Sequence, residues 1–82
     1  MMQIKFSERF QRSYKEAPER VRKDFNKQGR YLLKNLRHPS LHAKKHGEAQ
    51  GIWQARINRD WRFYFIIDGD TYRCIDIMQH PK

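Results

Sequence analysis

The sequence predicts a small α+β domain in the order βααβββ, with two N-terminal helices packed on one face of a twisted, mainly antiparallel sheet. Apolar residues recur at helical spacing in the N-terminal half and alternate with polar residues in the C-terminal half, and a segment rich in proline and glycine separates the two patterns. Because only 38% of the 82 residues are hydrophobic, the chain can fill one small core. We therefore expect one domain over residues 1–82.

A short strand is predicted at residues 2–6, where apolar and polar side chains alternate strictly. The hydroxyl of Ser7 can cap the helix that follows, and Glu8 places a negative charge in its first turn, where the helix dipole favours it. The apolar positions then recur at helical spacing: Phe10, Tyr14 and Ala17. This first helix should span residues 7–17 and end at Pro18.

A second helix of about 19 residues is expected to begin at Pro18, which is tolerated at a first helical position, and to reach the His38-Pro39 pair. Its apolar stripe has a period of 3.6 residues, with Gln28 in the middle: Val21, Phe25, Leu32 and Leu36. Gly29 weakens the isolated helix by about 1 kcal/mol, so tertiary packing must stabilise it. The outer face of this helix is a row of Arg and Lys.

Residues 38–50 show no periodicity and are predicted to form an exposed loop. Three antiparallel strands are expected after it, at residues 52–57, 61–67 and 71–78, because aromatic and β-branched residues alternate there. The Asp68-Gly69 pair is a typical hairpin-turn signal. The N-terminal strand must join this sheet.

The two faces of the predicted sheet differ in chemistry. One face is apolar: Trp53, Ala55, Ile57, Trp61, Phe63, Phe65 and Ile67. The other face mixes cations with an aromatic residue: Gln54, Arg56, Arg62, Tyr64 and Ile66. This second face is either an ordinary solvent-exposed surface or a phosphate-binding surface on which Tyr64 stacks a base.

The charge of the chain favours a nucleic-acid partner. Eighteen Lys and Arg against nine Asp and Glu give a net charge of +9, and residues 20–45 hold nine basic residues and one acidic residue. The alternative is a basic soluble protein without such a partner. The longest apolar run, residues 63–67, is far shorter than the roughly 20 residues of a membrane span. With a single cysteine, Cys74, the sequence favours a soluble protein of the reducing cytoplasm.

No motif for a nucleotide, dinucleotide or other cofactor occurs in the sequence, so no cofactor is expected. Three histidines are spaced by four residues, which on a helix would suggest a zinc site: His38, His42 and His46. Pro39 and Gly47 interrupt that spacing. A solvated loop is the simpler interpretation, and no metal site is expected.

His80 follows the last predicted strand, at the edge where the cationic face ends. Its imidazole can donate or accept a proton at neutral pH, and Arg56 and Arg62 could neutralise a five-coordinate phosphate beside it. These groups suffice to cleave RNA through its own 2′-hydroxyl, without a metal ion. An ordinary surface histidine is the alternative.

These features together resemble the RelE/ParE superfamily of bacterial type II toxins. The resemblance covers nearly the whole chain and rests on the order βααβββ and four segments: residues 51–56, residues 60–65, the Asp-Gly turn and residues 77–80. It implies a cytoplasmic toxin that a cognate antitoxin inhibits in a hetero-oligomer. In the RelE branch, it implies an enzyme that enters the ribosome and cuts messenger RNA between the nucleotides of a codon.

The resemblance also implies roles for individual residues. Arg56 corresponds to a basic residue that contacts the RNA backbone, Arg62 to the arginine that stabilises the transition state, and His80 to the group that acts on the leaving oxygen. Gln54 stands where some members have lysine, and no tyrosine follows His80, so His80 is the only obvious proton carrier. Expected RNA contacts are Lys44, Lys45, Gln54, Tyr64 and Lys82.

The basic face of the second helix is expected to bind ribosomal RNA rather than the substrate, because the helix and the open sheet face point in different directions. Its residues are Arg22, Lys23, Lys27, Arg30 and Lys34. Two alternatives to the nuclease remain: a non-catalytic ParE-like toxin that binds DNA gyrase, and a basic RNA-binding module without nuclease activity.

Overall fold

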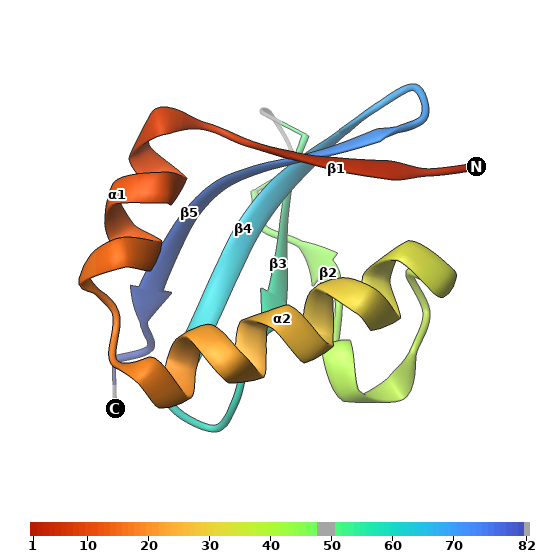
Figure 1. Ribbon diagram of the computed structural model, residues 1–82. Coiled ribbons are helices and arrows are strands. Elements are labelled where there is room, and N and C mark those ends of the chain that lie inside the picture. The colour runs from red at the N-terminus through yellow and green to blue at the C-terminus, as the bar shows by residue number, and fades with distance from the viewer. Residues whose placement is uncertain (48–50, 82) are drawn as a thin grey trace.

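A five-stranded sheet and two helices make up the fold in the computed structural model, which describes residues 1–47 and 51–81 (Figure 1). The elements follow one another as β1 (Gln3–Phe6), α1 (Glu8–Glu16), α2 (Glu19–Lys34), the 3-10 helix η1 (Pro39–Leu41), β2 (Lys44–Lys45), β3 (Ile52–Arg56), β4 (Trp61–Asp68) and β5 (Thr71–Gln79). The predicted α+β order is confirmed, with β2 as an additional strand.

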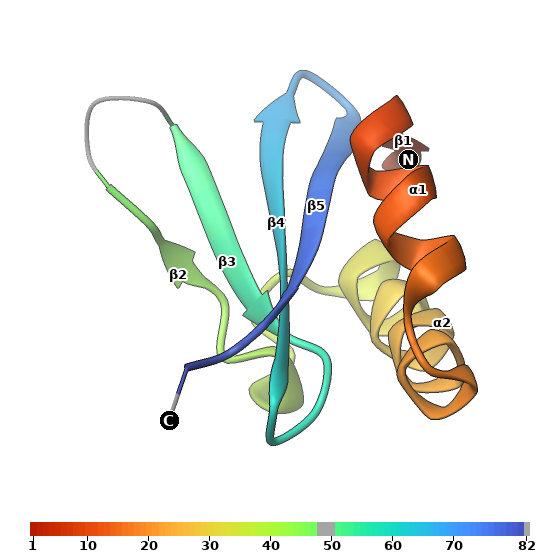
Figure 2. The same ribbon diagram turned by 90° about the vertical axis from the view of Figure 1, so that its left-hand side faces the viewer.

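The strands lie in the order β1-β5-β4-β3-β2. β1 runs parallel to β5, with Gln3 opposite Thr71, and the other neighbours are antiparallel. Both helices lie on one side of the sheet, and the opposite face is left uncovered (Figure 2). The prediction that the N-terminal strand joins the sheet is therefore right.

The predicted caps explain where the first helix begins. The Ser7 Oγ accepts a hydrogen bond from the Phe10 N–H at 3.0 Å, and α1 ends at Glu16. The second helix is shorter than predicted, because α2 ends at Lys34 instead of reaching His38. Asn35 leaves the helix in an extended conformation, and its Oδ1 accepts the Arg37 N–H at 2.9 Å. Asparagine competes in this way with helical hydrogen bonding.

The core lies between the helices and the covered face of the sheet. The ring of Phe25 on α2 packs at 5.0 Å from Phe10 on α1 and at 5.0 Å from Phe63 on β4. The largest fully buried side chains are Phe63, Phe65, Leu32, Leu41 and Cys74. Neither helix of the described residues has an apolar stretch that could cross a membrane.

The segment predicted as an exposed loop is partly ordered and partly buried. Leu41 of η1 is fully buried, and β2 pairs with β3, placing Lys44 opposite Gln54. A strand of two residues has no periodicity, so the sequence pattern could not reveal it. The loop prediction was therefore wrong for η1 and β2, and residues 48–50 lie outside the described residues.

Gln28 connects α2 to both η1 and β3. It is buried, and its Nε2 donates to the Arg56 carbonyl at 2.8 Å and to the Ser40 carbonyl at 3.1 Å. The Ser40 hydroxyl donates to its Oε1 at 3.3 Å. The polar residue in the middle of the apolar stripe therefore holds η1 against the end of β3.

Candidate functional site

A cavity of about 350 Å³ lies where β3 ends, β4 begins and β5 ends. Its lining residues are His42, Ala43, Lys44, Gln54, Arg56, Arg62 and His80. The structure therefore brings together Arg56, Arg62 and His80, the three residues that the sequence suggested for catalysis. Lys44 and Gln54, two of the expected RNA contacts, line the same cavity.

The antiparallel register explains this convergence. Arg56 is the cross-strand partner of Arg62, so the two guanidinium groups start from adjacent backbone positions. Gln79 pairs with Trp61, and the N–H of His80 donates to the Asp60 carbonyl at 2.6 Å. Residues that are 24 positions apart in the chain, Arg56 and His80, thus meet at one edge of the sheet.

Arg62 is more buried than the open-face prediction allows, with 8% of its surface exposed. Its Nη1 donates to the carbonyls of two turn residues between β3 and β4, Asn58 at 2.8 Å and Arg59 at 3.2 Å, and to the carbonyl of Trp61, the first residue of β4, at 3.0 Å. Burial, and then the nearby Arg56 charge, lower the pKa of Arg62. The side chain therefore organises this turn while it lines the cavity.

Arg56 has a different environment. Its Nε is buried and has no hydrogen-bond partner among the described residues. Neither of the two ion pairs in that part of the chain, Lys23 with Glu19 and Arg73 with Asp68, involves an arginine of the cavity. Two adjacent cations that form no ion pair within residues 1–47 and 51–81 suit an anionic ligand such as a phosphodiester.

The three histidines with four-residue spacing do not converge. The ring of His38 stacks on Tyr31 at 3.9 Å, the ring of His46 packs against Tyr64 at 5.1 Å, and His42 lines the cationic cavity. Within residues 1–47 and 51–81, no group of three His, Cys, Asp or Glu side chains could hold a metal ion.

His42 is the cavity residue that the sequence reasoning missed. It follows η1 in a left-handed conformation, with φ 46° and ψ 43°. That conformation is uncommon for a residue other than glycine, although histidine adopts it more readily than most. The only local signal for His42 was its place in a basic segment before Lys44. That signal predicts an exposed side chain, but it does not predict which cavity the side chain lines.

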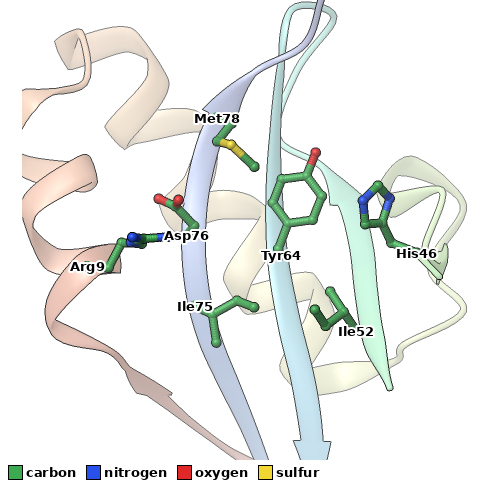
Figure 3. A pocket seen from close by; sticks show the side chains of 7 residues that line it. All are labelled: Arg9, His46, Ile52, Tyr64, Ile75, Asp76 and Met78. Carbon is green, nitrogen blue, oxygen red and sulfur yellow. The ribbon is translucent and has the colours of Figure 1, made fainter. Parts of the chain in front are cut away.

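The remaining expected RNA contacts lie elsewhere. Tyr64 lies on the same open face but lines a neighbouring cavity (Figure 3). Lys45 is exposed on β2 opposite Trp53 and does not line the cationic cavity. Lys82 lies outside the described residues.

The cations of α2 do not form one uniform row. Lys23 pairs with Glu19 at 3.4 Å, and Arg22 is partly buried and donates to the Ala17 carbonyl. Arg30 and Lys34 are exposed.

Part of α2 also borders the site. Lys27 and Arg20 line a cavity of about 460 Å³ that shares His42 and Arg56 with the cationic cavity. At this point α2 adjoins the cationic cavity, because Gln28 binds both η1 and the end of β3; the expectation that the cations of α2 bind ribosomal RNA stays a prediction.

Solved structures share this architecture. YoeB from Staphylococcus aureus, solved as a dimer, matches with a TM-score of 0.80 at 19% sequence identity, covering 98% of this chain and 98% of that chain. YafQ from Escherichia coli strain BL21(DE3) matches with a TM-score of 0.79 at 18% sequence identity, covering 96% of this chain and 93% of that chain. This is the RelE/ParE fold.

A third structure with the RelE/ParE fold is RelE in the RelB-RelE antitoxin-toxin complex from Methanococcus jannaschii. It matches with a TM-score of 0.75 at 18% identity, over 90% of this chain and 87% of that chain. No family model and no curated protein matches the sequence. At these identities the comparisons establish the fold, and the chemistry has to be argued from the site.

Proposed function

We propose that this protein is the toxin of a type II toxin-antitoxin system and that it cleaves messenger RNA at the ribosome without a metal ion. The observation that carries the proposal is the convergence of Arg56, Arg62, His42 and His80 on one cavity. The RelE/ParE fold supports it, because the same architecture occurs in known toxins.

The reaction needs only groups that this cavity contains. One imidazole takes the proton of the ribose 2′-hydroxyl, whose oxygen then attacks the adjacent phosphorus. The bond from phosphorus to the 5′-oxygen breaks, and the other imidazole donates a proton to that oxygen. The products are a 2′,3′-cyclic phosphate and a free 5′-hydroxyl, so no water, metal or redox partner is consumed. We assign the general acid, which protonates the leaving 5′-oxygen, to His80, and the general base, which removes the 2′-hydroxyl proton, to His42.

The arginines stabilise the charge that develops on the phosphate in the transition state. Arg62 is held in place by three carbonyls, which limits its reorganisation during the reaction. Arg56 contributes an Nε–H that has no partner among the described residues, and a phosphate oxygen can accept its hydrogen bond. Lys44 and Gln54 line the same cavity and contact the RNA backbone on either side of the cleaved phosphate.

The basic residues beyond the cavity extend the RNA-binding surface. Lys27 and Arg20 contact the phosphates next to the site, through the cavity that shares Arg56. The exposed Arg30 and Lys34 bind ribosomal RNA. A cognate antitoxin inhibits the toxin in a hetero-oligomer; the RelB-RelE and YoeB-YefM toxin-antitoxin complexes, which share this fold, support this part of the proposal.

Expression in a bacterial host tests this proposal. Wild-type protein should stop translation and leave transcripts cut within codons, and His80→Ala should reduce the cleavage rate by about 10²- to 10⁴-fold. His38→Asn is the matched control, because it changes a histidine outside the cavity and keeps a side-chain acceptor for the Ser40 N–H. Intact transcripts with the wild type would overturn the nuclease, and an accompanying DNA-damage response would favour gyrase as the target.

The assignment of the base predicts the effect of a second substitution. His42→Ala should reduce the cleavage rate by about 10²- to 10⁴-fold, as His80→Ala does. An unchanged rate in His42→Ala would mean that another group removes the 2′-hydroxyl proton.

A further inference from the structure

A second cavity of about 310 Å³ lies on the open sheet face beside the cationic one (Figure 3). It combines apolar and aromatic side chains with one carboxylate and one guanidinium: its lining residues are Arg9, His46, Ile52, Tyr64, Ile75, Asp76 and Met78. We propose that this cavity binds the nucleobase next to the cleaved phosphate and that Asp76 selects bases that present an amino group over uracil. The proposal rests on the proposed function and specifies its substrate.

Tyr64 provides the stacking surface. Figure 3 views its ring face-on between Ile52 and Met78, with the hydroxyl pointing toward the end of β5 where Met78 lies. The ring of His46 packs against it at 5.1 Å and holds its orientation. An aromatic ring held in this way is the platform on which RNA-binding proteins stack unpaired bases.

The two cavities are close enough for one nucleotide to contact both. Tyr64 follows Arg62 by two residues on the same face of β4, and such positions lie roughly 6 to 7 Å apart along a strand. A base on Tyr64 therefore places its phosphate beside Arg62.

A β-bulge directs Asp76 into the second cavity. Tyr64 pairs with Asp76 and Phe65 pairs with Cys74, so Ile75 is an extra residue on β5. Helix α1 holds the bulge, since the Ser7 hydroxyl donates to the Ile75 carbonyl at 3.0 Å. Bulges of this kind reorient side chains next to functional sites.

The hydrogen bonds of Asp76 leave one oxygen for a ligand. Oδ1 accepts from the Ser13 hydroxyl at 2.6 Å and from the Ile77 N–H at 2.8 Å, and Oδ2 accepts no hydrogen bond from any described residue. A carboxylate oxygen can accept a hydrogen bond from the amino group of adenine, cytosine or guanine. Uracil presents carbonyl oxygens on both sides of its only N–H, and these repel a carboxylate. The cavity should therefore disfavour uracil.

Titration of the isolated protein with the four nucleoside 3′-monophosphates tests the subsite without requiring cleavage. The adenosine, cytidine and guanosine nucleotides should shift the ring proton resonances of Tyr64 and bind about 5-fold or more tightly than the uridine nucleotide. Asp76→Asn should abolish this preference, because its amide can donate to a uracil carbonyl while Oδ1 still serves Ser13 and Ile77. Glu16→Gln, which removes an exposed carboxylate from α1, should retain the preference.

Two variants at Tyr64 test the stacking surface independently of Asp76. Tyr64→Phe should bind nucleotides nearly as well as the wild type, and Tyr64→Leu should bind all of them about 5- to 150-fold more weakly. Equal affinity of the wild type for all four nucleotides, or a preference that survives in Asp76→Asn, would overturn the subsite. A base preference in a protein that cuts no transcripts would leave the subsite standing and overturn the nuclease.

Discussion

The side chains on the two faces of the sheet have opposite environments: those on one face are packed in the core, and those on the other face include charged groups that lack ion-pair partners among the described residues. On the helix-covered face, Phe63 and Phe65 are fully buried, and Phe63 packs edge-on against Phe25 at 5.0 Å. On the open face, Arg56 and Arg62 are neighbours without a carboxylate partner among the described residues, and the Nε of Arg56 lacks a hydrogen bond there. The covered face thus stabilises the fold, and the open face holds two neighbouring guanidinium groups that form no ion pair within the described residues.

Two adjacent residues on β4 give the sharpest test of this difference. Phe63→Ala should lower the free energy of unfolding by about 3 to 5 kcal/mol, because it leaves a cavity in the core. Tyr64→Ala, one residue further along β4 and on the other face, should lower the free energy of unfolding by about 1 kcal/mol or less. Urea denaturation followed by circular dichroism measures both values. Similar losses at the two positions would contradict the division between the faces.

The two arginines should separate stability from activity. Arg62→Ala should lower the free energy of unfolding by about 1.5 to 3 kcal/mol, because the carbonyls of Asn58, Arg59 and Trp61 lose a charged donor. Arg56→Ala should leave stability almost unchanged, since its buried Nε has no partner among the described residues to lose. Both variants should cleave RNA more slowly. Thermal unfolding of the pair, measured beside their cleavage rates, would refute this comparison if Arg56→Ala proved the less stable.

Gln28 links the covered face to the open one, so its loss should affect both. Gln28→Leu should lower the free energy of unfolding by about 1 to 2 kcal/mol, because the Arg56 and Ser40 carbonyls lose a buried hydrogen-bond donor. Cleavage should also slow, since η1 and the end of β3 border the cationic cavity. Asn26→Ala, an exposed change on the same helix that removes only the exposed hydrogen bond from the Tyr14 hydroxyl, should alter the free energy of unfolding by no more than about 0.5 kcal/mol. Equal effects of the two variants would show that Gln28 has no linking role.

Cys74 on the covered face gives the smallest expected effect. Burial raises the pKa of its thiol from about 9 to about 12, so the folded protein keeps a proton that the unfolded chain loses first. Stability should therefore fall as the pH rises from 9 toward 12, by less than about 1 kcal/mol up to pH 9.5. Burial also raises the pKa of Tyr72, which acts in the same direction at higher pH. Cys74→Ala should show a shallower decline, and parallel slopes would exclude the thiol as the cause.

Local patterns determined most of the architecture. Strict alternation predicted β1, the Ser7 hydroxyl predicted the start of α1, and the Asp68-Gly69 pair predicted the turn in which Gly69 has a φ of 59°. These features were accessible because the interactions that decide them lie within a few residues of one another. The alternation of the strands and the position of His80 after the last strand pointed to Arg56, Arg62 and His80, and the resemblance to the RelE/ParE superfamily added a role for each; the structure brings the three to one cavity.

Only the tertiary structure decided how the site is completed. The short strand β2, the place of His42 in the cavity and the bulge that directs Asp76 left no periodic signal in the sequence. The three carbonyls that hold Arg62 and the bonds that Gln28 makes to η1 and β3 were equally invisible there. Most of these contacts join residues far apart in the chain, and their partners are set by strand register and packing rather than by local spacing.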